Sequence, residues 1–158
     1  MTQTRWLDDE EREAWLAFVG VLLRLGPALD SQMVRDAGLT HFDYQVLAML
    51  SMAEDRRLRM SELAAQTNAS LSRLSHVVKK LEARGWIERT PDPESRRTTI
   101  ASLTADGWDA VVEAAPGHVE AVRQLVFDGL DRRQVAQLTA IATRMRANID
   151  DSGLSSTC

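Results

Sequence analysis

The residues with the clearest chemical potential lie between positions 70 and 80 and are mostly hydroxyls and long cations: Ser70, Ser72, Arg73, Ser75, His76, Lys79 and Lys80. Apolar residues recur between them at spacings of three and four, which predicts an amphipathic helix that packs one face inward: Leu71, Leu74, Val77, Val78 and Leu81. Small hydroxyls let a helix approach base edges, an arginine fork can bind guanine bidentately, and lysines pair with phosphates. The pattern therefore indicates contact with nucleic acid.

A second pair of cations, Arg96 and Arg97, lies at the end of a polar, proline-bearing stretch that spans residues 91–97. Short stretches rich in β-branched residues flank it at 86–90 and 98–103, which predicts a β-hairpin with this stretch as its loop. Residues 58–60 could add a short third strand. A hairpin tipped by two arginines can contact DNA beside the helix at 70–85.

Other helices must hold these cations in place, and the sequence predicts them. Ser61 is expected to begin a short support helix, with small alanines where two helices must approach closely. An acidic run at residues 8–11 begins a long amphipathic helix that continues to Gly38, with a kink expected at Gly26-Pro27. Thr40 resembles the start of a capping box for a helix through Met52.

The last two helices are predicted to begin at Thr104 and Asp131, and a Pro-Gly pair at 116–117 interrupts the first of them. The whole order is helix, helix, strand, helix, helix, hairpin, helix, helix. The predicted fold is mainly α with a small β-hairpin wing: a winged helix-turn-helix at 40–104 between helices at 6–38 and 105–149. Residues 150–158 are expected to form a disordered tail.

The balance of charge differs between the predicted winged helix-turn-helix and the rest of the chain. The chain as a whole carries −4, yet residues 56–104 hold ten Arg and Lys against five Asp and Glu. A basic segment in an acidic frame suits a DNA-binding module, because neutralising phosphates supplies much of its affinity. The N-terminus lacks the basic-then-apolar order of a signal peptide, and no unbroken apolar run is long enough for a membrane span, so we expect a cytoplasmic protein.

Catalysis is not expected. The sequence contains no glycine-rich phosphate loop, nucleophile elbow or histidine pair at helical spacing, and no cofactor is predicted. The lone cysteine, Cys158, excludes an internal disulfide and is a poor oxidant sensor, since nothing near it would lower its pKa. The rival function is a winged helix that binds protein and never reads DNA, although the basic charge and the arginine-tipped hairpin disfavour it.

Three segments resemble the multiple-antibiotic-resistance regulator (MarR) family of bacterial winged-helix transcription factors. They are residues 60–64 (MSELA), residues 81–89 (LEARGWIER), and residues 92–97 (DPESRR) leading to residues 103–107 (LTADG). The resemblance covers nearly the whole chain, to about Ile149. The LExRG run alone is common among winged helices, and its coupling to an arginine-tipped wing and LTxxG is much more specific.

The resemblance implies an obligate homodimer, joined by the N-terminal and last two helices, on a pseudo-palindromic operator, with repression as the family habit. By position, Ser70, Ser72, Arg73, Ser75 and His76 would lie in the major groove. Arg96 would reach the minor groove, with Arg97 joining it or bracing the hairpin. Two residues depart from the family pattern. Ser95 stands where an aspartate usually precedes the wing arginines, so that Asp92 or Glu94 must substitute or the wing is looser. His76 stands where arginine is frequent, which would weaken phosphate affinity and could make binding pH-sensitive.

Family members often release DNA when a small aromatic or phenolic anion binds between the dimerisation helices and the DNA-binding lobe. The aromatic and imidazole candidates for that pocket are Trp15, Phe18, His41, Tyr44 and Trp108, each of which could equally be plain core. A regulator without a ligand response is the alternative. His41, His76 and His118 are far apart in sequence and form no metal-ligand motif, although separate helices could bring them together.

Overall fold

The structure, a computed structural model, describes residues 4–153, with the side chain of Arg96 excepted. Its elements, in chain order, are α1 (Asp9–Ala37), α2 (His41–Met52), the 3₁₀ turn η1 (Glu54–Arg56), β1 (Arg57–Arg59), α3 (Met60–Gln66), α4 (Leu71–Ala83), β2 (Ile87–Asp92), β3 (Ser95–Leu103), α5 (Ala105–Val122), the π-helical turn η2 (Arg123–Phe127) and α6 (Arg132–Asp151). The predicted class, mainly α with a small β wing, is confirmed.

Local sequence signals set most of the helix starts. Thr40 and Asp131 each form a capping box with the third residue of the helix that follows, and the Thr104 hydroxyl accepts the backbone N–H of Gly107. The support helix α3 begins one residue before the predicted Ser61. Its Glu62 carboxylate accepts the backbone N–H of Arg59 at 3.0 Å, which fixes the start there.

The wing belongs to a three-stranded antiparallel sheet of order β1-β3-β2. The short first strand forms as a third strand, but it spans residues 57–59 rather than the predicted 58–60, because Met60 already belongs to α3, and its Arg57 pairs with Ser102. The predicted seven-residue loop is too long, however. The β2–β3 ladder continues to the Asp92–Ser95 pair across an irregularity at Pro91/Asp92, so only residues 93 and 94 lie between the strands.

The core of the winged lobe gathers side chains from α2, α3, α4 and the sheet, together with Met33 of α1 and Val111 of α5. Leu47, Leu63, Leu74 and Leu81 are among its fully buried members. The predicted inward face of α4 is wrong in one position: Leu71 is 57% exposed. It is the first residue of the helix and lies on the edge facing the wing, outside the stripe that reaches the core.

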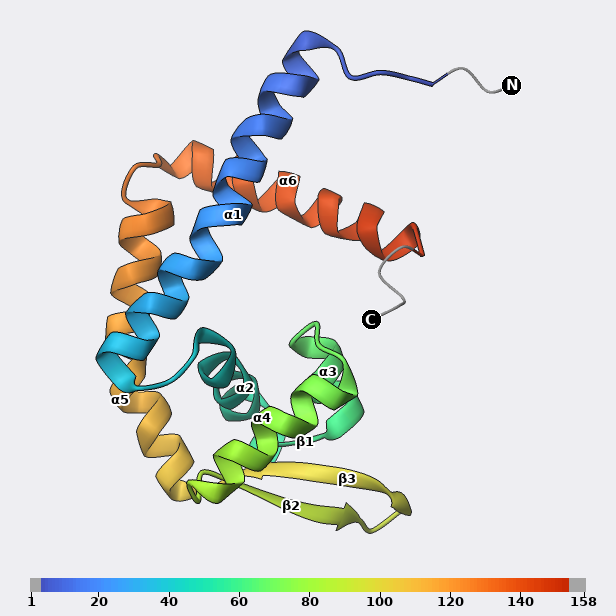
Figure 1. Ribbon diagram of the computed structural model, residues 1–158, viewed down its shortest axis with the longest axis vertical. Helices are drawn as coiled ribbons and strands as arrows, with labels where there is room; N and C mark the ends of the chain where they lie inside the picture. Colours follow the sequence, from blue (N-terminus) through green and yellow to red (C-terminus); the bar gives the residue numbers. More distant parts are fainter. Residues whose placement is uncertain (1–3, 154–158) are drawn as a thin grey trace.

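α1, α5, η2 and α6 form an arm beside the lobe (Figure 1). α1 extends away from the lobe, and α5 packs along the C-terminal half of α1. Pro27 and Pro116 lie inside continuous helices. α6 runs to Asp151, two residues into the segment predicted as tail, and Cys158 lies outside the described residues. By length and composition alone, one stretch of α1 is apolar enough to cross a membrane.

The glycine of the LTxxG motif marks a close approach between α5 and the wing. A Cβ at Gly107 would lie 2.2 Å from the carbonyl oxygen of Trp86 and 2.8 Å from Leu103 Cδ1. We expect Gly107→Ala to lower the free energy of unfolding by about 2–3 kcal/mol, because backbone must shift to make room. Urea denaturation followed by circular dichroism measures this. Gly129→Ala is the control, since a Cβ there meets nothing within 4 Å.

Candidate nucleic-acid interface

The exposed face of α4 divides into three strips, set by the angular spacing of 100° per residue. Ser72, His76 and Lys79 form the central strip, opposite the buried leucines, and all three are exposed. Among the described residues none of these three forms an ion pair or a side-chain hydrogen bond. Their donors and acceptors are therefore available to a ligand such as DNA.

The strip nearest α2 is already engaged within the protein. The guanidinium carbon of Arg73 lies 4.0 Å from the ring centroid of Phe42. Two turns further along, Lys80 forms an ion pair with Asp43, whose side chain is 1% exposed. The two adjacent lysines thus have different environments, and a phosphate contact by Lys80 would compete with its buried partner.

The third strip of α4 faces the wing. Leu71 and Ser75 line a hollow of about 340 Å³, closed on the other side by Arg97, Thr98 and Thr99 of β3. The two threonines bear hydroxyls and were not among the predicted site residues, although they directly follow the wing arginines in the sequence. Ser70 lies directly before α4 and is not among the residues that line this hollow. Its hydroxyl accepts the backbone N–H of Arg73 at 3.2 Å, which makes it the N-cap of α4.

A carboxylate braces the wing despite the serine at position 95. Asp92 is buried, accepts the backbone N–H of Glu94 at 2.9 Å and accepts from Arg59 Nε at 2.8 Å. Arg59 also reaches Glu94 at 3.0 Å. The hydrogen bond from Glu94 and the pairing with Arg59 together hold the pKa of Asp92 below its usual value. Asp92 therefore has the bracing contacts that Ser95 lacks, and its arginine comes from β1.

We expect Arg59→Gln to loosen the wing tip, because it removes the cation that bridges Asp92 and Glu94. Amide exchange at Glu94 should speed up, and operator affinity should fall by about threefold to tenfold through lost preorganisation. Hydrogen–deuterium exchange and fluorescence anisotropy measure the two effects. Arg57→Gln is the control, since its partner Asp55 lies on the neighbouring turn. Equal exchange rates in Arg59→Gln and the wild type would contradict the brace.

The five residues predicted for an effector pocket do not meet within one chain. His41 and Tyr44 lie together, both against the ring of His118, at centroid distances of 5.3 and 4.7 Å. Trp15 and Phe18 are exposed on the arm, with Trp15 about 22 Å along α1 from Asp30, which accepts the His41 backbone N–H. Trp108 lies under Arg56, at 3.8 Å from the guanidinium to the ring.

His118, whose ring contacts His41 and Tyr44, was not among the predicted effector-pocket residues and was weighed only as a metal ligand. Its Nδ1 is buried and has no hydrogen-bond partner among the described residues. His41 and His118 do converge, but the described residues hold no group of three or more His, Cys, Asp or Glu side chains that could bind a metal ion. Burial lowers the pKa of His118, and the neighbouring His41 lowers it further.

This lowered pKa predicts acid sensitivity of folding. The unfolded chain binds the proton at about pH 6.5 while the folded His118 resists it, so stability is full above that pH and declines as the pH falls. Burial lowers the pKa of the neighbouring His41 as well, so the share of the loss that belongs to His118 alone should stay below the roughly 1.4 kcal/mol per pH unit of one whole proton. Urea denaturation between pH 5 and 8 measures the total loss, and His118→Phe should reduce it. The exposed His76→Phe is the control, and equal pH profiles for the wild type and His118→Phe would contradict the prediction.

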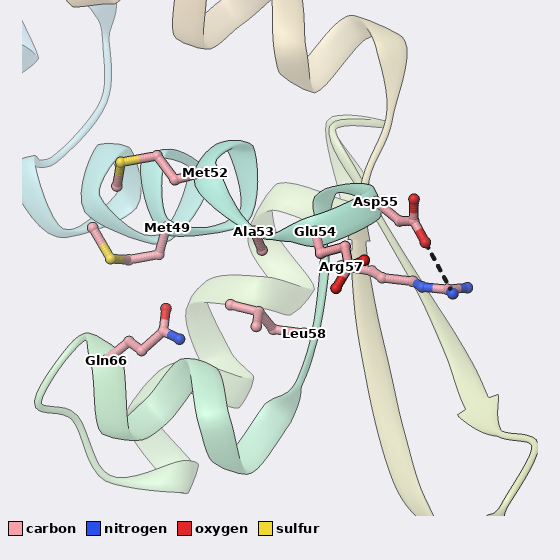
Figure 2. A pocket seen from close by; sticks show the side chains of 8 residues that line it. All are labelled: Met49, Met52, Ala53, Glu54, Asp55, Arg57, Leu58 and Gln66. Carbon is pink, nitrogen blue, oxygen red and sulfur yellow. Dashed lines mark hydrogen bonds and ion pairs between the residues drawn. The ribbon is translucent and has the colours of Figure 1, made fainter.

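The largest hollow we describe lies on another side of the lobe (Figure 2). It measures about 640 Å³ and is lined by Met49, Met52, Ala53, Glu54, Asp55, Arg57, Leu58 and Gln66. The two methionines extend from α2 at one end, and Asp55 pairs with Arg57 at the other at 3.3 Å. The lining includes no nucleophile beside a base, so it offers no support for catalysis.

Comparisons with known proteins agree with the winged-helix fold. A sequence profile of the MarR family matches residues 37–98. Sco3205 of Streptomyces coelicolor, a MarR family transcriptional regulator solved in complex with DNA, is 42% identical, with 92% of this chain and 91% of that one covered and a TM-score of 0.87. AbsC of the same organism, also a MarR family regulator, is 36% identical over 91% of this chain and 99% of its own, with a TM-score of 0.82.

Among curated sequences, the transcriptional repressor MprA of Escherichia coli is 26% identical over 120 residues. That match spans 76% of this chain and 68% of MprA.

Proposed function

The chain belongs to the MarR family of DNA-binding transcriptional regulators, and from that premise we propose that it is a homodimeric repressor of a pseudo-palindromic operator. The observation that carries DNA readout is the central strip of α4, which is exposed, has no ion pair or side-chain hydrogen bond among the described residues and lies beside the hollow between α4 and the wing. In this proposal Ser72, His76 and Lys79 enter the major groove with Arg73. Arg96 and Arg97 approach the minor groove from the wing, and the cytoplasm is the site of action.

The apolar surface of the arm supports the dimer. Large apolar side chains on the arm are exposed in the single chain, among them Trp15, Leu16, Leu22, Leu125, Ile141 and Ile149. α6 has no buried residue at all among those described. A monomer rarely exposes so many large apolar side chains on one set of helices, and a second copy would cover them. The same partner accounts for the apolar stretch of α1 without a membrane. Light scattering after size exclusion should give twice the chain mass.

Selection of bound duplexes from a random pool tests the readout. We expect enrichment of an inverted repeat whose half-sites lie about one helical turn apart, matching the two-fold axis of a dimer. Affinity for that duplex should fall steeply with added salt, because phosphate contacts release counterions. A winged helix that only binds protein would enrich no sequence. An empty selection at low salt would therefore exclude the proposed function.

Regulation by a small aromatic or phenolic acid is a further part of the proposal. The corner of the half-buried His41 and His118 and the buried Tyr44 supports it, since the corner joins the lobe to the arm and its His118 Nδ1 has no hydrogen-bond partner among the described residues. Adding benzoate- and phenol-type acids to the bound duplex tests release. A regulator with no ligand response would hold the DNA at all concentrations that leave the protein folded.

A further inference from the structure

The ring of Phe42 lies against the guanidinium of Arg73. Phe42 is the second residue of α2, is half-buried and packs against the core of the lobe, so contacts within the protein hold its ring. Arg73 is exposed and makes no ion pair with any residue that the structure describes. The stacking contact at 4.0 Å is therefore what orients its guanidinium in the free protein.

Stacking differs from ion pairing in what it leaves free. An aromatic ring contacts the flat face of the guanidinium, whereas the five N–H donors point outward in its plane. A carboxylate partner would occupy those donors, as Asp43 occupies the ammonium of Lys80 two turns away. The first turn of α2 thus holds α4 at two points, and only the Phe42 contact leaves its cation able to form a bidentate contact with a base.

We propose that Phe42 is a specificity-determining positioning residue, which orients the fork of Arg73 for a bidentate contact with one guanine of each half-site. The inference rests on the proposed function, since it presupposes that α4 reads DNA. A flexible arginine would still attract phosphates by its charge. A guanidinium that is already oriented loses less conformational freedom on binding. The resulting gain in affinity is largest at the base whose two acceptors match the two donors of the guanidinium.

The experiment uses the full-length protein and the duplex selected by the wild type. Its half-site guanines are replaced one at a time by 7-deazaguanine, which lacks the N7 acceptor. We expect the wild type to lose about tenfold in affinity at one position. Phe42→Leu should lose less than about threefold there, and its ratio of operator to non-operator affinity should fall by about threefold to tenfold. Phe42→Tyr retains the aromatic face and should behave as the wild type.

The control variants separate positioning from packing. Met49→Leu alters another half-buried apolar residue of α2 and should leave discrimination unchanged. Arg73→Lys keeps the charge but lacks the fork, and adding Phe42→Leu to it should cause no further loss if Phe42 acts through Arg73. Phe42→Met gives a second non-aromatic side chain should the leucine variant fail to fold.

Three results would overturn the inference. These are full discrimination by Phe42→Leu or Phe42→Met, equal losses in Phe42→Tyr and Phe42→Leu, or additive losses in the double variant. Each of them leaves the proposed function intact, because the wild type would still bind its selected duplex. A wild type that selects no sequence would remove both together.

Discussion

Replacing Arg73 and Arg96 together by alanine should weaken operator binding by at least about 100-fold, because one removes a predicted base contact and the other a wing contact in both half-sites. Non-operator binding should weaken less, since the central strip keeps Lys79. The salt dependence should also become shallower, because fewer counterions are released. Fluorescence anisotropy titrations at several salt concentrations measure both quantities.

The matched control for this experiment is Arg132→Ala with Arg133→Ala, which also removes two cations from each chain. Both arginines are exposed at the start of α6, so their loss changes the total charge without altering α4 or the wing. Equal affinities for the wild type and the Arg73/Arg96 double variant would show that α4 and the wing do not read this DNA. A loss in the control double variant as large as that of the Arg73/Arg96 variant would point to net charge alone.

Replacing Lys80 by methionine should lower the free energy of unfolding by about 2–4 kcal/mol, because it leaves the carboxylate of Asp43 buried without its cation. The loss is smaller than for a fully buried pair, because the side chain of Lys80 is partly exposed and water screens its charge. Asp43 retains only the capping hydrogen bonds of Thr40, and its Oδ1 has no partner among the described residues. Urea denaturation at pH 7 measures the loss.

The double variant Lys80→Met with Asp43→Asn separates a stranded charge from lost packing. It should recover part of the stability, because no charge then remains buried and the asparagine oxygen can still accept from Thr40. Lys79→Met is the matched control, since its side chain is exposed and unpaired in the part of the chain described, and it should change stability by less than about 0.5 kcal/mol. A Lys80→Met variant as stable as Lys79→Met would disprove a structural role for the pair.

The ion pair between Lys80 and Asp43 should also make the stability of the fold depend on pH in the acid range. Burial raises the pKa of Asp43, but the hydrogen bonds from Lys80 and Thr40 more than offset it, so the pKa lies below its ordinary value of 3.8. The folded state therefore favours the carboxylate, and the stability it contributes is present above the ordinary pKa and lost as the pH falls through the lowered one. Lys80→Met should reduce this dependence.

The sequence by itself determined the elements and the family of this protein. Capping residues at Thr40, Thr104 and Asp131 act on the turn that follows them, and the apolar spacing of α4 acts over a few residues, so both are visible in a short window of sequence. The hydroxyl- and cation-rich face of α4 and the basic balance of residues 56–104 are likewise local properties. Motifs such as LTxxG then identified the family.

Only the tertiary structure decided what each side chain of that face contacts. Lys79 and Lys80 are neighbours of the same type, yet Lys80 pairs with Asp43, 37 positions away, whereas Lys79 forms no ion pair with any residue whose side chain is described. The carboxylate that braces the wing is Asp92, and its arginine is 33 positions earlier. The contacts of Phe42 with Arg73 and of His118 with Tyr44 likewise join residues that are far apart in the sequence. Such partners depend on how helices and strands pack, and no residue spacing along the chain encodes the angle at which α2 crosses α4.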